Sequence, residues 1–166
     1  MARMGITLSR RRSVLVCAVA AASLCVAVAV WSRPDYSVPA GPFARTAPCS
    51  DVVARLPENL MGRGRDAVDG EGTAGWGARA VVLRCGVEPL APTIDTCVNV
   101  NGFDWVLDDA RVKRDGAWVF TTYGREPAVE VAFARGSQPA GDALVTINDA
   151  LGSLAQKTKC LALSDT

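Results

Sequence analysis

The chain contains no histidine among its 166 residues. This absence excludes an imidazole general base, a Ser-His-Asp or Cys-His catalytic arrangement and any metal site with histidine ligands. An enzyme built on this chain would depend on carboxylate and arginine chemistry, which is possible without histidine.

The motifs of several common site classes are also missing. No C-x-x-C pair is present, so neither a zinc site nor a thiol redox site of the usual spacing is predicted. The glycine-rich stretch 60–77 contains no G-K-[ST] and no G-x-G-x-x-G, which are patterns of phosphate-binding loops. Asp108 and Asp109 lack the spacing of an EF-hand, and we interpret them as a solvated turn. We therefore predict no cofactor and no metal.

Positive charge is scarce beyond the N-terminus. The chain has 18 basic and 17 acidic residues. Four of the basic residues precede a hydrophobic run: Arg3, Arg10, Arg11 and Arg12. Without these four, 14 basic residues face 17 acidic ones. A nucleic-acid-binding protein would show a basic footprint instead, so we expect no nucleic-acid partner.

Residues 13–31 form a hydrophobic run without a charge. A helix of this length spans about 28 Å at 1.5 Å per residue, close to the hydrocarbon thickness of a bilayer. By the positive-inside rule, the arginines before it predict a cytoplasmic tail of residues 1–12 and an exported remainder. We favour a retained single-pass anchor in the cell membrane. A cleaved signal peptide is the alternative, with Ala27-Val28-Ala29 as its cleavage site.

Residues 32–48 form a spacer between this anchor and the predicted extracytoplasmic domain, residues 49–166. The spacer is rich in proline, at Pro34, Pro39, Pro42 and Pro48. Such a composition is semi-rigid and packs poorly, so we expect it to hold the domain off the membrane surface.

Six cysteines divide between the anchor and the exported part. Cys17 and Cys25 lie in the hydrophobic run, where they act as small apolar residues. An even number in an oxidising compartment predicts two disulfides among the remaining four: Cys49, Cys85, Cys97 and Cys160.

Geometry favours one of the three possible pairings of these cysteines. Cys49 lies on the apolar face of a short predicted helix. Cys85 lies on the apolar face of the strand predicted over residues 80–87, because side chains alternate with a period of two. If the helix packs on that face, Cys49 meets Cys85, and Cys97 is left to pair with Cys160.

Short apolar runs separated by turn signals predict an antiparallel sheet. Asn101-Gly102 and Asp115-Gly116 are the turn signals of two hairpins. The glycine-rich stretch 60–77 is expected to be a mobile surface loop, with Trp76 at its end reaching the core. Strands are expected over residues 80–87, 94–100, 103–107, 110–114, 117–123 and 128–134.

A C-terminal helix is predicted over residues 139–158. Its apolar residues recur at spacings of three and four and suit the covering of a sheet: Leu144, Ile147, Leu151 and Leu154. Cys160 would point away from this stripe if the helix continued, so we expect the helix to end near Thr158 and the tail to turn back toward Cys97. The predicted class is α+β: an N-terminal transmembrane helix, then an antiparallel sheet packed with a short helix and a longer C-terminal helix.

Polar and aromatic residues gather at the ends of two predicted strands. Asp104 and Arg125 could form a charged pair there, with Trp105 and Tyr123 lining a pocket beside it. We therefore name these four as candidate binding residues, and no residue as catalytic. The plainer interpretation, which we favour, is that Asp104 caps a turn, Arg125 pairs with it and the aromatic rings fill the core.

Several segments together resemble a known family: VVLRCGV at 81–87, VNGFDW at 100–105, FTTYGR at 120–125 and AVEVAF at 128–133. With the hydrophobic run and Cys49 before a short helix, the chain is similar to the actinobacterial domain of unknown function family 3515. The resemblance implies a membrane-associated exported protein and supplies no activity. Cys49 and Cys85 match cysteines of that family, whose association with genes for cell-wall precursor synthesis favours an envelope role.

The leading hypothesis is a non-catalytic accessory of the cell envelope that binds another exported protein or a wall component. It depends on the anchor, the spacer, the two disulfides and the lack of a catalytic constellation. The alternative is an enzyme in which Asp104 is the base and Arg125 holds an anionic substrate. A third interpretation is a purely structural spacer domain.

Overall fold

The computed structural model describes residues 35–137, 140–152 and 154–160, all within one structural unit. The predicted tail and anchor, residues 1–31, lie outside these ranges. Among the described residues, no helix has both the length and the apolar character needed to cross a bilayer.

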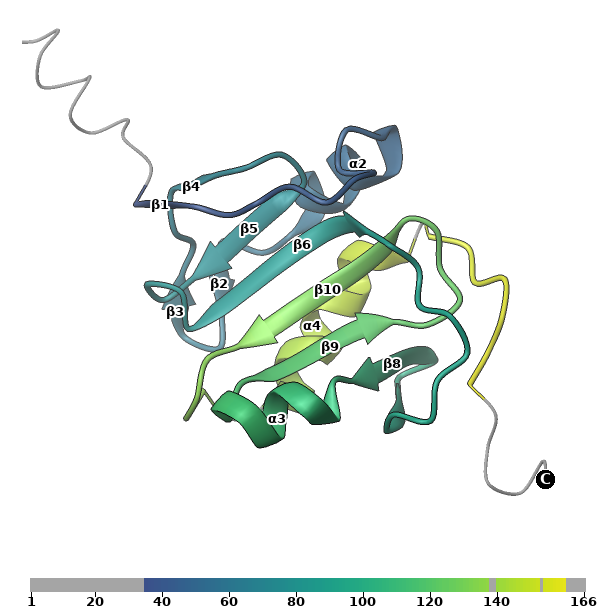
Figure 1. Ribbon diagram of the computed structural model, residues 1–166. Coiled ribbons are helices and arrows are strands. Elements are labelled where there is room, and N and C mark those ends of the chain that lie inside the picture. The colour runs from purple at the N-terminus through teal and green to yellow at the C-terminus, as the bar shows by residue number, and fades with distance from the viewer. Residues whose placement is uncertain (1–34, 138–139, 153, 161–166) are drawn as a thin grey trace, which may run out of the picture. The chain divides into compact units, whose positions relative to one another are not determined.

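A six-stranded antiparallel sheet is the centre of the fold (Figure 1). Its strands lie in the order β5-β6-β10-β9-β8-β7, and every neighbouring pair is antiparallel, as predicted. In chain order they are β5 (Thr73–Trp76), β6 (Val81–Val87), β7 (Cys97–Val100), β8 (Phe103–Leu107), β9 (Trp118–Thr122) and β10 (Ala128–Phe133).

Helices α2 (Ala47–Arg55) and α4 (Ala140–Leu151) bury their apolar sides in the same core as the sheet. Figure 1 shows α4 behind the sheet, and α2 packs against both α4 and β6. The alternation expected in β10 is present, since Val129, Val131 and Phe133 are buried and Glu130 is not. The α+β class is therefore confirmed for the described residues.

The hairpin of β7 and β8 has the predicted turn, but its first strand is shorter than predicted. Asn101 and Gly102 both have a positive φ, 47° and 84°, as a type I′ turn requires. The strand starts at Cys97 rather than at residue 94, and the side chain of Ile94 is fully exposed. The predicted apolar run therefore began in an exposed loop.

Residues 110–114 were wrongly predicted to be a strand, and they are part of helix α3 (Asp109–Asp115). The carboxylate of Asp108 accepts a hydrogen bond from the backbone N–H of Arg111 at 2.8 Å, which caps the first turn. Gly116 ends the helix in the left-handed conformation, with φ at 71°. The Asp-Gly pair is thus a helix end rather than a hairpin turn.

The glycine-rich stretch contains short strands rather than the single long loop that was predicted. Trp76 at its end is fully buried, as expected. The Asp66 carboxylate organises the stretch by accepting hydrogen bonds from the backbone N–H groups of Ala78 and Arg79 and from the Tyr36 hydroxyl. Besides β5, the stretch and its flanks contain β2 (Asn59–Leu60), β3 (Arg63–Gly64) and β4 (Val68–Asp69).

The described part of the predicted spacer packs onto the domain, contrary to expectation. β1 (Tyr36–Ser37) pairs in parallel with β4, and Val38 and Ala44 are buried. Gly41 lies so close to β6 that a Cβ there would overlap the carbonyl oxygen of Gly86. Two glycines without side chains allow this approach of backbone to backbone, which the proline content concealed.

Gly41→Ala should destabilise the domain, because the added methyl group must displace the backbone of β6. We expect the free energy of unfolding, measured in urea, to fall by about 1–3 kcal/mol, the usual range for overpacking. Gly141→Ala is the matched control. Gly141 lies in α4 with nothing within 4 Å of the position of its Cβ, so alanine should stabilise the helix by up to about 1 kcal/mol. A Gly41→Ala protein as stable as the wild type would contradict the observed packing.

The C-terminal helix is shorter than predicted. It stops at Leu151, and the backbone N–H of Leu154 turns back to the Leu151 carbonyl oxygen. Glycine at position 152 costs about 1 kcal/mol in a helix interior, which favours ending there. The tail then runs beside Gly124, whose carbonyl accepts from the N–H of Lys157 at 2.7 Å. The expected return of the tail is confirmed, although it begins well before Thr158.

Candidate functional site

The structure joins Cys49 to Cys85 and Cys97 to Cys160, the pairing favoured by the sequence. The first disulfide lies in the core, where both cysteines are fully buried, and it ties α2 to β6. The second ties the start of β7 to the end of the described chain, and both of its cysteines are partly exposed.

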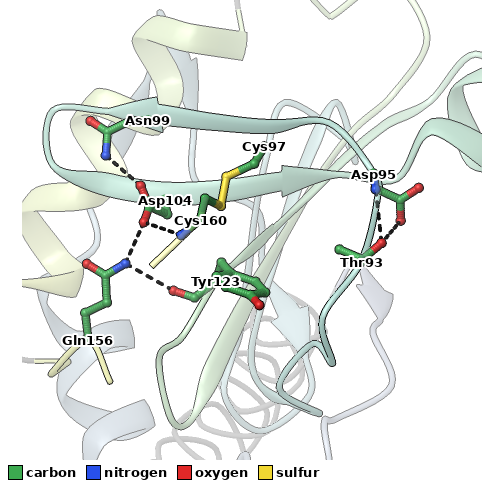
Figure 2. The surroundings of a disulfide bond; sticks show 8 residues. All are labelled: Thr93, Asp95, Cys97, Asn99, Asp104, Tyr123, Gln156 and Cys160. Atoms are coloured by element: carbon green, nitrogen blue, oxygen red, sulfur yellow. Dashed lines mark hydrogen bonds between the residues drawn. A yellow bond between two sulfur atoms is a disulfide. The ribbon is translucent and has the colours of Figure 1, made fainter. Parts of the chain in front are cut away.

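Asp104 lies on β8 beside the second disulfide (Figure 2). Its side chain is 6% exposed. The carboxylate accepts three hydrogen bonds: from the Asn99 side chain at 2.7 Å, from the Gln156 side chain at 2.8 Å and from the Cys160 backbone N–H at 3.1 Å. These donors come from β7 and from the C-terminal tail, so Asp104 holds the tail against the sheet.

These contacts also set the charge of Asp104. Burial by itself raises the pKa of this carboxyl group. The hydrogen bonds from Asn99, Cys160 and Gln156 and the charge of Lys159 outweigh burial and hold the pKa below its ordinary value. Asp104 is therefore ionised at neutral pH.

Arg125 follows β9 and is 7% exposed. Its guanidinium donates to the backbone carbonyl oxygen of Leu154 and lies over the ring of Phe103, 4.1 Å from the centroid. Burial lowers the pKa of Arg125, and the negative charge of Asp104 partly offsets this. Among the described residues, the ion pairs within 4.0 Å do not include these two, so their charges interact without direct contact.

The two aromatic candidates, Trp105 and Tyr123, lie in different environments. Trp105 is fully buried in the core, where its indole N–H donates to Asn148 at 3.1 Å. Tyr123 is partly exposed and contributes only backbone groups: its N–H donates to the Asp104 carbonyl at 2.8 Å, and its carbonyl accepts from Gln156 at 3.5 Å. Trp105 and Asp104 therefore point to opposite faces of β8.

Sequence reasoning missed Asn99, Gln156 and Asn148. Asn99 had a signal, because the two-residue turn fixes the register of the hairpin and places Asn99 opposite Asp104. Gln156 and Asn148 had none, since they reach the sheet from the tail and from α4 across 52 and 43 positions of the chain.

Two cavities in the described part of the protein lie away from the Asp104 cluster. The smaller, about 160 Å³, is lined by Phe43, Thr46, Pro89, Glu126 and Pro127. The larger, about 510 Å³, lies between α2 and the turn before β5 and is lined in part by Arg45, Ser50 and Glu71. Neither contains any of the four candidate residues.

Most of the chain, including the residues described above, matches a known protein family. The model of a family described as protein of unknown function (DUF3515) matches residues 13–160. The chain belongs to this family. The DUF3515 match spans both disulfides and the Asp104 cluster, and it assigns no activity to them. No curated protein and no solved structure matches the chain.

Asp104→Asn should lower the stability of this DUF3515 domain at pH 7 by about 3 kcal/mol, because a buried, hydrogen-bonded charge is lost beside Arg125. The folded-state pKa of Asp104 is depressed, so its contribution is present above the unfolded-state pKa, about 4, and is lost as the pH falls through the folded-state value. The difference between variant and wild type should therefore shrink below about pH 4.

Urea unfolding of both proteins from pH 7 to pH 3 measures this difference. Asp66 also has a lowered pKa, so the variant keeps part of the acid sensitivity. A stability gap that stays constant down to pH 3 would contradict a role for the ionised carboxylate.

Proposed function

We propose that this DUF3515 protein is a non-catalytic binding module, anchored in the cell membrane by residues 13–31 and exposed on the extracytoplasmic side, where it contacts another exported protein. The observation that carries the non-catalytic part is the internal use of the Asp104 and Arg125 groups. The carboxylate accepts from three donors, and the guanidinium donates to the Leu154 carbonyl and lies over the Phe103 ring, while its buried Nε has no hydrogen-bond partner among the described residues.

An enzyme that used these two residues would need both groups free to meet a substrate. A general base must lie within hydrogen-bond reach of the proton it removes. Here the C-terminal tail takes that place, since Gln156 and Cys160 donate to Asp104 and Leu154 accepts from Arg125. The geometry therefore supports a structural role for the cluster over a catalytic one.

The proposed compartment is supported by the two disulfides. Disulfides persist in oxidising environments outside the cytoplasm and are rare inside it. The arginines before residues 13–31 favour the matching orientation, with the N-terminus inside. Because β1 begins at Tyr36, only residues 32–35 separate the proposed anchor from the folded domain.

A contact surface is supported by exposed apolar side chains around the smaller cavity. Phe43 is 41% exposed and lines the cavity together with Pro89 and Pro127. Leu90, next in the chain to Pro89, is 36% exposed. We name Phe43, Pro89, Leu90 and Pro127 the Phe43 surface. Aromatic residues in apolar depressions are the usual anchors of protein interfaces.

Photo-crosslinking in intact cells tests the proposal. A photoreactive amino acid is placed at Phe43 or at Leu90, and at Lys113 on α3 as an exposed control position. We expect both positions on the Phe43 surface to attach the same exported or membrane protein, and Lys113 to attach none. Crosslinks to wall material alone would replace the protein partner by a wall component, and equal products at all three positions would contradict a specific surface.

A reporter enzyme that is active only after export tests the orientation separately. Fused after Thr166, it should be active in intact cells and should fractionate with membranes. Activity in the medium without membrane association would show that the N-terminal run is cleaved.

A further inference from the structure

The two disulfides differ in their access to solvent. Cys49 and Cys85 are both 0% exposed, whereas Cys97 and Cys160 are partly exposed. A thiolate reduces a disulfide by direct attack on one of its sulfur atoms. We therefore expect an external thiol to reduce the Cys97–Cys160 bond before the Cys49–Cys85 bond, which is reached only after the core opens.

The accessible disulfide lies against a third metal-ligating group. The sulfur atoms of Cys97 and Cys160 and a carboxylate oxygen of Asp104 all lie within 4.8 Å of one another. Figure 2 shows the carboxylate beside the disulfide, oriented by Asn99 on one side and Gln156 on the other. The carboxylate thus already lies beside the two sulfur atoms, and a metal ion would share it with the donors Asn99, Gln156 and the Cys160 N–H.

We propose that reduction of the Cys97–Cys160 disulfide converts this cluster into a binding site for a thiophilic divalent cation such as Zn²⁺. The ligands would be the two thiolates and the Asp104 carboxylate, with water in the fourth position. In the reducing step an external dithiol gives two electrons and two protons to the disulfide and becomes a disulfide itself. Each cysteine thiol then releases its proton to solvent as the metal binds.

The distances suit this conversion. Zinc binds sulfur at about 2.3 Å and carboxylate oxygen at about 2.0–2.2 Å, so tetrahedral ligand atoms lie roughly 3.3–3.8 Å apart. After the S–S bond opens, the sulfur atoms must separate by roughly 2 Å. Cys160 would supply this movement beyond the Gln156 and Lys157 contacts that hold the tail, because Thr158 and Lys159 before it are exposed.

A divalent cation suits the charge of the cluster once both thiols have lost their protons. Reduction places three groups that can carry negative charge within 4.8 Å. The positive groups whose charges act on Asp104 or respond to it are Lys159 and Arg125. Neither donates a hydrogen bond to the carboxylate, whose donors are Asn99, Gln156 and the Cys160 N–H. A divalent cation at the centre of the cluster neutralises it directly.

The test uses the full chain in a non-ionic detergent, with Cys17→Ser and Cys25→Ser to remove the other thiols. Limited treatment with a dithiol, without denaturant, should reduce Cys97 and Cys160 and leave the buried disulfide intact, as shown by alkylation and mass spectrometry. Zn²⁺ titrated against a chromophoric chelator should then bind at one ion per reduced chain. Co²⁺ in its place should show thiolate-to-metal absorption.

Variants separate this site from two loose thiols. Asp104→Asn should weaken Zn²⁺ binding by about tenfold or more, since even an outer-shell partner is worth that much. Asp95→Asn is the control, because Asp95 is two residues from Cys97 and its carboxylate accepts from the Thr93 hydroxyl at 3.0 Å (Figure 2). Cys160→Ser removes a ligand and leaves Asp104 unchanged, so it tests the site even if the Asp104→Asn protein does not fold. It should also weaken Zn²⁺ binding.

Three results would overturn the proposal. One is reduced protein that takes up no Zn²⁺. Another is equal binding by the oxidised and reduced chains. The third is an affinity unchanged by Asp104→Asn, because an unfolded chain holding the metal through its thiols alone would behave in that way.

Discussion

Replacing Cys49 and Cys85 together by alanine is expected to lower the free energy of unfolding by about 4 kcal/mol. The bond closes a loop with a sequence separation of 36, and the chain-entropy relation gives this loss when the unfolded chain is released from such a loop. Alanine suits both positions because both side chains are fully buried. A domain with a typical stability of about 5–15 kcal/mol would lose a large part of it.

The second disulfide supplies the comparison. Its sequence separation is 63, so loop entropy alone predicts at least as large a loss from the double change Cys97→Ala and Cys160→Ala. We expect a smaller one, because the tail after Leu154 can leave the sheet and regain freedom in the folded state. Urea unfolding without reductant measures both double variants. A greater loss from opening the tail would contradict the view that the buried disulfide holds the core together.

The sheet could be predicted because its central strands alternate clearly. In β6 and β10 every second residue is apolar and buried, and period two is the strongest local signal of a half-buried strand. The pairing of Cys49 with Cys85 followed from the same reasoning, since it needed only one helix on one face. Patterns of this kind depend on residues close in sequence, so they can be recognised without knowledge of the fold.

The structures of residues 110–114 and of the glycine-rich stretch depend on hydrogen bonds. The periodicity of apolar residues in the sequence does not reveal such bonds. Residues 110–114 were ambiguous over so short a span, and the deciding groups were the cap at Asp108 and the left-handed Gly116 at the two ends. The glycine-rich stretch is held by Asp66, whose partner Tyr36 lies 30 positions away. A carboxylate that gathers distant backbone N–H groups leaves no local pattern.

The candidate residues were named from the sequence, but their arrangement in the fold was not predicted. Asp104 and Arg125 do gather at one end of the sheet, yet the tail lies between them and solvent. Nothing in the composition of the tail indicated this, because Gln156 reaches Asp104 across 52 positions. Trp105 was grouped with Asp104 as its neighbour in sequence, although neighbours on a strand face opposite ways.

Trp76 is buried, as predicted, and we expect it to contribute strongly to the stability of the domain. It ends the edge strand β5 opposite Val81 and is fully buried in the core cluster. Its indole N–H donates to the carbonyl oxygen of Pro57 at 3.0 Å, just after α2. One side chain therefore joins the sheet edge, the core and the chain that leaves the helix.

Trp76→Ala is expected to cost about 3–5 kcal/mol in the free energy of unfolding, because it removes a large buried ring and leaves the Pro57 carbonyl without its donor. Trp76→Phe should cost less, since most of the volume stays and mainly the hydrogen bond is lost. Trp118→Ala is the matched control, because that ring is 37% exposed on β9, and it should cost less than half as much. Urea unfolding ranks the three variants. If Trp118→Ala proved the more damaging change, the glycine-rich edge would be peripheral to the fold, and the core would have to be centred on β9.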